Sequence, residues 1–146
     1  MTEQFLTFNN KKLAFAVHGS GPALMLVHGY TESKEIWFPM AEKLGEKYTV
    51  IMPDLPGHGG SDVIENLSME IMAKQMDMLA DKLQLERFTM IGHSMGGYMT
   101  ACYASLKEHR LNGFGFFHSS ARADTAEGKT NRDRVMEIIE KDHGDT

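Results

Sequence analysis

Cysteine, positive charge and long apolar runs are all scarce in this 146-residue sequence. The single cysteine, Cys102, excludes an internal disulfide and fits a reducing compartment, so we expect a cytoplasmic protein. Lysine and arginine total 15 against 20 aspartate and glutamate residues, which gives a formal net charge of −5. Nucleic acids and anionic membranes select basic surfaces, and neither is therefore expected as a partner.

Targeting and membrane-spanning signals are also missing. The opening residues, MTEQFLTFNN, have neither the basic start nor the apolar core of a secretory signal. No apolar run approaches the roughly 20 residues that cross a membrane as a helix. Hydrophobic residues make up 42% of the chain and charged residues 24%, a balance typical of one folded domain with one hydrophobic core.

Strand-like runs and helical stripes alternate along the chain. Two apolar runs, 4–8 and 12–17, flank the turn-forming stretch NNKK and predict an antiparallel hairpin. Later apolar runs predict four more strands, at residues 23–27, 48–52, 88–91 and 113–117. Helical patterns fall between these strands. The alternation indicates an α/β fold in which helices flank a mostly parallel sheet.

The first of these helices should begin near Phe38, because Pro39 is tolerated only in a first helical turn. Four apolar residues recur at helical spacing and should form its buried side. They are Trp37, Met40, Ala41 and Leu44. Ser68 is placed to cap the start of the second helix.

The stretch Gly92-His93-Ser94-Met95-Gly96 has the pattern G-x-S-x-G between a predicted strand and a predicted helix. In this setting the serine occupies a sharp, strained turn, and the flanking glycines keep the two backbones from crowding each other. The serine then lies at a helix N-terminus, where the positive end of the helix dipole favours an alkoxide or an oxyanion. The setting therefore indicates that Ser94 is a nucleophile.

Four motifs in a fixed order resemble the N-terminal half of the α/β-hydrolase fold family. LMLVHGY (24–30) is similar to the strand and HGx turn that carry half of the family's oxyanion hole. Trp37 stands where many members have a tryptophan that opens the next helix. PDLPGHGGSD (53–62) is similar to the family's D-x-P-G-x-G-x-S loop, and IGHSMGG (91–97) to its nucleophile elbow. The resemblance covers nearly all of this chain but only a little over half of a typical member.

The resemblance implies roles for the residues that match. Ser94 would be the nucleophile, and the backbone N–H groups of Tyr30 and Met95 would form the oxyanion hole. The glycine-rich loop 53–62 would be loop architecture rather than direct chemistry, because its residue types are common turn formers.

Three histidines are candidates for the pocket. His28 is expected to hold the oxyanion turn by hydrogen bonds. His93 is expected to pack or to form hydrogen bonds rather than to transfer protons. His118 ends the 113–117 strand, at the side of a parallel sheet where active-site loops gather, and could either line the pocket or be structural.

The family's acid and histidine follow the serine along the chain, and no strand that could carry them is recognisable after residue 117. Residues 1–120 are therefore interpreted as a partial α/β-hydrolase core and 121–146 as the start of a cap segment. The cap segment predicts one amphipathic helix with Val135, Ile138 and Ile139 on its apolar side.

One alternative triad, Ser94 with Asp124 and His143, follows the family's order. We do not favour it, because His143 lies in a charged stretch without a rigid strand end to hold a base within about 3 Å of the serine. Three other histidines are no better placed: His18, His58 and His109.

The sequence therefore predicts a truncated serine hydrolase of the esterase type that acts on a small-molecule ester. The serine disfavours the relatives that use an aspartate, namely haloalkane dehalogenases and epoxide hydrolases. No metal cluster or phosphate-binding glycine loop is recognisable, so no cofactor is expected. The alternative is a catalytically inactive fragment that needs a C-terminal part or associates with itself through an exposed last strand, 113–117.

Overall fold

The computed structural model describes residues 1–123 and 125–143, with the side chains of residues 139, 140, 142 and 143 left out. Its strands and helices alternate in the predicted order. The strands are β1 (Glu3–Phe8), β2 (Lys11–His18), β3 (Ala23–Val27), β4 (Thr49–Pro53), β5 (Phe88–His93) and β6 (Leu111–Phe117). The α-helices are α1 (Phe38–Leu44), α2 (Met69–Lys82), α3 (Met95–Lys107) and α4 (Ala126–His143). Two short 3-10 helices, η1 (Lys34–Trp37) and η2 (Glu108–Arg110), complete the set.

The six strands form one sheet in the order β1-β2-β4-β3-β5-β6. β1 pairs with β2 and β2 with β4 in antiparallel fashion, and the three remaining pairings are parallel. The predicted hairpin and the predicted α/β class with a mostly parallel sheet are both confirmed. β3 and β5 are direct neighbours, with Val27 opposite Gly92, so the segments that follow these two strands emerge side by side.

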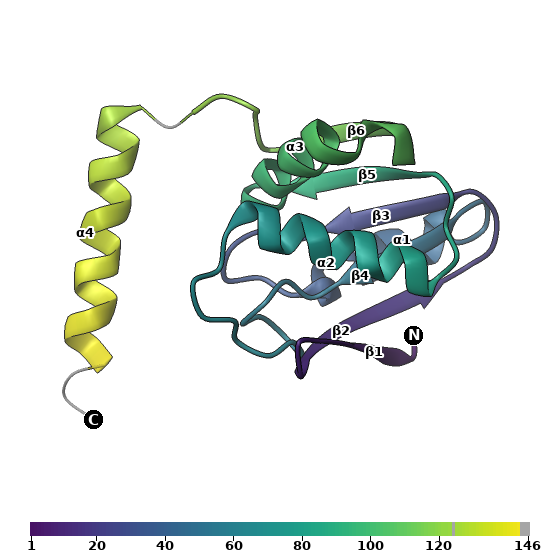
Figure 1. The fold of residues 1–146 in the computed structure, drawn as a ribbon, viewed down its shortest axis with the longest axis horizontal. Helices are drawn as coiled ribbons and strands as arrows, with labels where there is room; N and C mark the ends of the chain where they lie inside the picture. The colour runs from purple at the N-terminus through teal and green to yellow at the C-terminus, as the bar shows by residue number, and fades with distance from the viewer. Residues whose placement is uncertain (124, 144–146) are drawn as a thin grey trace.

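Helices cover both faces of the sheet (Figure 1). Alternate residues of β3 separate the two apolar layers: Met25 packs with α2 and α3, and Leu26 packs with Trp37 and α1. α1 begins at Phe38 as predicted, directly after η1. Ser68 caps α2 by accepting a hydrogen bond from the Ile71 N–H at 3.3 Å.

The buried side predicted for α1 was wrong at one residue, Met40. Trp37 and Ala41 are buried, but the Met40 side chain is 42% exposed. At about 100° per residue, positions 37, 41 and 44 fall within a narrow row, whereas position 40 lies roughly 60° to its side. Phe38, on the other side of this row from Met40, also packs against the same apolar layer, so the buried side is turned away from Met40.

Asp77 joins the two helices that cover one face. Its carboxylate accepts a hydrogen bond from the Tyr103 hydroxyl at 2.8 Å and lies 3.0 Å from the Lys107 ammonium and 3.2 Å from the Arg110 guanidinium. Burial alone would raise the pKa of Asp77, but the hydrogen bonds from Lys107 and Tyr103 outweigh it, and the pKa lies below the ordinary value.

β6 is an edge strand that exposes large apolar side chains. Among the described residues, β5 is the only strand that pairs with it. Phe114 and Phe116 are 52% and 37% exposed, and their rings lie 5.8 Å apart on one side of the strand. The exposed last strand expected from the sequence is therefore present.

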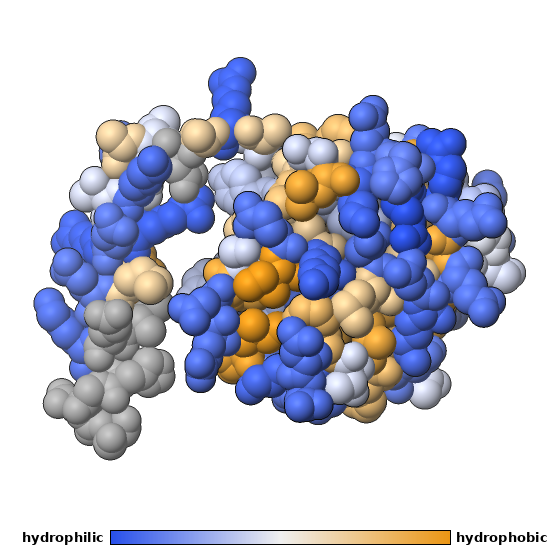
Figure 2. Space-filling model, in the orientation of Figure 1, coloured by the Kyte–Doolittle hydropathy of each residue, from blue (hydrophilic) through white to orange (hydrophobic). Residues whose placement is uncertain are grey.

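α4 stands apart from the sheet and its covering helices (Figures 1 and 2). The predicted helix is confirmed, but Val135 and Ile138 on its predicted apolar side are 50% and 53% exposed. The side chain of Ile139 is outside the described residues. Among the described helices, none combines the length and apolar character needed to cross a bilayer. The division at residue 120 into core and cap stays a prediction.

Candidate active site

The candidate site lies where β3 and β5 end side by side. Because the two strands are parallel and adjacent, the turn after β3 and the turn after β5 meet at the carboxyl edge of the sheet. The first turn carries Gly29 and Tyr30, and the second carries Ser94. The structure therefore brings together residues that are more than sixty positions apart in the sequence.

Ser94 occupies a strained turn between β5 and α3. Its backbone has φ 50° and ψ −116°, a conformation that non-glycine residues rarely adopt. The flanking glycines leave no room for a side chain: a Cβ on Gly92 would collide with the Gly96 carbonyl, and one on Gly96 would lie 2.5 Å from the His28 carbonyl oxygen. This close approach of β5, α3 and the end of β3 explains why both positions are glycine.

Residues at the end of β6 and directly after it also fix the backbone of Ser94. The Ser94 N–H donates to the Phe117 carbonyl at 3.2 Å, and the Ser119 hydroxyl donates to the Ser94 carbonyl at 2.7 Å. Met95 is the first residue of α3, so its N–H has no acceptor within the helix. The serine side chain itself is exposed.

The buried ring of His28 holds the turn after β3 through hydrogen bonds. Its Nε2 accepts a hydrogen bond from the Leu55 N–H at 2.9 Å, so the ring proton is assigned to Nδ1, which donates to the Gly29 carbonyl at 2.7 Å. Because Nε2 accepts, this fully buried ring is neutral, and its burial also lowers the pKa. The 3.9 Å approach of Asp54 is accordingly no ion pair.

Glu32 was not singled out in the sequence, yet it contacts both turns. Its Oε2 accepts hydrogen bonds from the Gly29 N–H at 2.6 Å and from His93 Nδ1 at 2.8 Å. Burial alone would raise the pKa of Glu32, but the hydrogen bonds from His93 and Gly29 outweigh it and bring the pKa below the ordinary value.

A cavity of about 520 Å³ opens over these turns. Its core side is lined by residues that include Tyr30, Ser94, Met95 and His118, so the predicted nucleophile and the two residues predicted to supply oxyanion donors border one space. His28 and His93 are not among the lining residues. The first lies buried beneath the turn, and the second bonds to Glu32.

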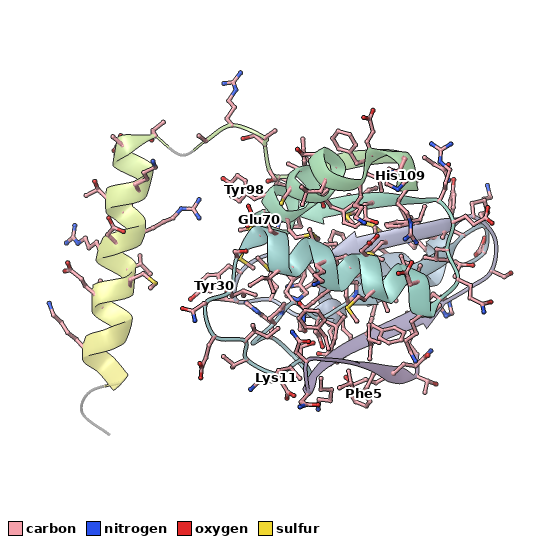
Figure 3. All side chains as sticks on the ribbon, viewed as in Figure 1. Phe5, Lys11, Tyr30, Glu70, Tyr98 and His109 are labelled. Carbon is pink, nitrogen blue, oxygen red and sulfur yellow. The ribbon has the colours of Figure 1, made fainter. Side chains whose placement is uncertain are left out.

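α4 forms the opposite side of this cavity. It contributes Asn131, Arg132, Val135 and Met136, and the Arg132 guanidinium lies 5.6 Å from the centre of the Tyr98 ring. Figure 3 shows Tyr30 and Tyr98 on the side of the core that faces α4. The cavity is therefore bounded by the rigid core on one side and by a single, separate helix on the other.

The loop between β4 and α2 supports the site without entering the cavity. Asp54 is fully buried, and its carboxylate accepts hydrogen bonds from the Lys34 N–H and ammonium, both at 2.7 Å, and from the Gly60 N–H at 2.8 Å. The Lys34 ammonium also contacts Glu3 at 2.6 Å. Burial alone would lower the pKa of Lys34, but the hydrogen bonds that its ammonium donates to Asp54 and Glu3 outweigh it and raise the pKa. This ion cluster fixes η1 and the glycine-rich loop to each other.

No histidine in the described part of the chain is hydrogen-bonded to the Ser94 hydroxyl. Asp124 and the His143 side chain of the alternative triad lie outside the described residues. Within the same described ranges, no three histidine, cysteine, aspartate or glutamate side chains gather as a metal-binding group.

The model of the alpha/beta hydrolase fold family matches residues 22–131. This match spans most of the chain and contains both turns of the site. The chain therefore belongs to the α/β hydrolase fold family.

Individual relatives carry different activities in their names. The chain is 40% identical over 104 residues to an uncharacterized protein of Mycobacterium tuberculosis, a match that covers 70% of this chain and 30% of the relative. It is 40% identical over 87 residues to a fluoroacetate dehalogenase of a Burkholderia species, covering 56% and 29%. The structure of a thermophilic esterase from Thermogutta terrifontis superposes with a TM-score of 0.85 at 34% identity, covering 95% of this chain and 53% of the esterase. The chain thus spans about half or less of the length of each.

Proposed function

We propose that this chain carries the nucleophile half of a serine hydrolase site that cleaves carboxylic esters of small molecules. The observation that carries the proposal is the convergence of Ser94, Met95 and Tyr30 on one cavity, with the serine exposed in a strained turn. In the proposed reaction the Ser94 hydroxyl attacks the ester carbonyl, and the Met95 and Tyr30 N–H groups stabilise the developing oxyanion. The alcohol leaves with a proton, and water then releases the acid.

The identity of the nucleophile separates this proposal from dehalogenation, despite the similarity to a dehalogenase. If a serine displaced a halide from carbon, the product would be an alkyl ether, which water does not cleave under mild conditions. A carboxylate in the same place would give an ester, which water can hydrolyse. A serine suits an acyl intermediate, because an acyl serine is itself an ester. The similarity to the Thermogutta esterase is in keeping with this choice.

A second candidate, a chain that is inactive by itself, is favoured by the surroundings of Ser94. A serine hydroxyl is a weak nucleophile without a base, and no histidine of the described residues is hydrogen-bonded to this one. We therefore propose that turnover needs a histidine supplied from elsewhere in the protein. The oxyanion donors alone leave only a small residual acceleration.

Labelling by a fluorophosphonate tests both proposals. The probe forms a bond from the serine oxygen to phosphorus with loss of fluoride, and peptide mass spectrometry then identifies the labelled residue. We expect slow labelling of the chain at Ser94, accelerated by added imidazole as a substitute base, and none in Ser94→Ala. Ser120→Ala, which removes an exposed hydroxyl nearby, is the matched control and should be labelled like the original chain.

Two results would count against these proposals. Imidazole-dependent labelling spread over several serines would contradict the assignment of Ser94 as nucleophile. Rapid, Ser94-dependent hydrolysis of p-nitrophenyl acetate by the chain alone would contradict the missing base.

A further inference from the structure

Glu32 connects the two turns that build the candidate site. It lies three residues after Gly29, and its Oε2 accepts both the Gly29 N–H at 2.6 Å and His93 Nδ1 at 2.8 Å. A carboxylate only accepts hydrogen bonds, so Nδ1 of His93 carries the proton in this contact. His93 immediately precedes Ser94. One carboxylate oxygen therefore joins the turn that carries Tyr30 to the strand end that carries the serine.

The hydrogen bonds of Glu32 and His28 act on the two peptide units that meet at Gly29. Glu32 holds the N–H of the His28–Gly29 unit, and His28 Nδ1 holds the carbonyl of the Gly29–Tyr30 unit. A trans peptide is planar, and its N–H points opposite to its C=O. Fixing the Gly29 carbonyl toward His28 therefore fixes the Tyr30 N–H in the opposite direction. With both units held, rotation about the Gly29 backbone is suppressed.

This turn needs an external restraint. Glycine has the widest range of backbone conformations, so Gly29 alone defines no direction for the next N–H. The Tyr30 side chain is 54% exposed and anchors the turn weakly. Thr31 has φ 62°, which a β-branched residue rarely adopts, and such a conformation persists only when its surroundings hold it.

The space around Gly29 confirms how closely these groups meet. A Cβ placed on Gly29 would lie 2.8 Å from Glu32 Oε2, 3.0 Å from the Ser94 Cβ and 3.3 Å from His93 Nδ1. The carboxylate, the serine Cβ and the His93 ring thus all surround the same side of Gly29, and the absence of a side chain on Gly29 leaves room for them.

We propose that Glu32 is a positioning residue, whose carboxylate locks the Gly29–Tyr30 turn against the His93–Ser94 strand end and so aims the Tyr30 N–H at the oxyanion. This inference rests on the proposed function, because the oxyanion arises only if Ser94 attacks an acyl or phosphoryl centre. Glu32 itself touches neither the substrate nor the reacting atoms.

Two substitutions of Glu32 separate its charge from its hydrogen-bond contact. Glu32→Ala removes the acceptor, whereas Glu32→Gln keeps an oxygen that can accept the Gly29 N–H and should retain most of the effect. Glu35→Ala is the matched control, because it removes an exposed carboxylate three residues further along the same segment. Two quantities are measured for each variant: the hydrogen exchange of the Gly29 and Tyr30 amides by NMR, and the rate of imidazole-assisted fluorophosphonate labelling at Ser94.

We expect Glu32→Ala to accelerate Gly29 exchange by about tenfold or more, since it loses a hydrogen bond to a charged acceptor. Its labelling rate at saturating probe should fall by a similar factor while the probe concentration for half-maximal rate changes little. A lower saturated rate with an unchanged half-maximal concentration indicates that the oxyanion donors are misdirected. General loosening of the cavity would change the half-maximal concentration as well. Glu32→Gln should restore most of both values, and Glu35→Ala should match the original chain.

The inference is overturned if Gly29 stays protected in Glu32→Ala, or if exchange accelerates while the saturated labelling rate equals that of Glu35→Ala. Failure of the proposed function gives a different result, namely no Ser94 labelling in the unsubstituted chain. In that event the amide exchange alone decides whether Glu32 holds the turn, and protection of Gly29 in Glu32→Ala again overturns it.

Discussion

Gly96→Ala should destabilise the protein although alanine is the better helix former. Gly96 lies in the first turn of α3, and a Cβ there would lie 2.5 Å from the His28 carbonyl oxygen and 2.6 Å from that of Val27. Both are backbone atoms at the end of a buried strand, so they cannot rotate away. Overpacking typically costs 1–3 kcal/mol, and two rigid contacts place this variant near ~3 kcal/mol. Helix propensity returns ~1 kcal/mol, which leaves a net loss of about 2 kcal/mol.

Urea denaturation measures this loss directly, and a fall in Tm of roughly 4–8 °C should accompany it at this chain length. Gly113→Ala is the matched control, because a Cβ on Gly113 meets nothing within 4 Å. The control should leave stability unchanged or slightly improved. If Gly96→Ala proved as stable as Gly113→Ala, the close approach of α3 to β3 and the reasoning from it would be refuted.

Three further predictions concern charge and the sheet edge. Lys34→Met should lower the free energy of unfolding, measured by urea denaturation, by about 3–5 kcal/mol, because Asp54 is left buried without its cation. Adding Asp54→Asn should recover part of this loss, and no recovery would contradict the ion-pair account. The pKa of Asp77 is lowered in the fold, so its contribution to stability is complete above the ordinary aspartate value near ~4 and is lost as pH falls through the lower folded value. Asp77→Asn should reduce the loss of stability that occurs as the pH falls through this range. An unchanged loss would contradict the assignment of this effect to Asp77. Phe116→Lys should reduce concentration-dependent self-association in light scattering, because it places charge on the exposed edge strand. If the variant associated as much as the original chain, β6 would not be the surface through which the chain associates.

The sequence predicted the elements and the position of the serine because these depend on local patterns. Continuous apolar runs end within two residues of the strand ends, and G-x-S-x-G marks a turn whose glycines are needed by close backbone approach. The prediction for α1 failed at Met40 because the buried side of this short helix is turned toward Phe38, on the other side of the row from Met40. The apolar side predicted for α4 is exposed, because α4 stands apart from the sheet.

The contacts of Glu32 could not be predicted in the same way. Its partners are Gly29, three residues earlier, and His93, sixty-one residues later, and only the pairing of β3 with β5 brings them together. A glutamate soon after an HG turn is otherwise an ordinary surface residue. The available signal was geometric: parallel neighbouring strands place the residues after them at one edge, so a carboxylate there can reach both turns.

The proposed separation of Ser94 from its base sets the size of the effect that added imidazole should have. The turns after β3 and β5 follow adjacent strands, so the geometry proposed for the oxyanion donors exists before any base arrives. A general base held in place typically accelerates a reaction by about 10²- to 10⁴-fold. Imidazole in solution is not held beside the serine, so it should restore only a small part of that factor. The labelling of Ser94 should rise linearly with imidazole and not saturate. Saturation at millimolar imidazole would instead reveal a binding place for the ring beside Ser94, and with it a site built to receive a histidine.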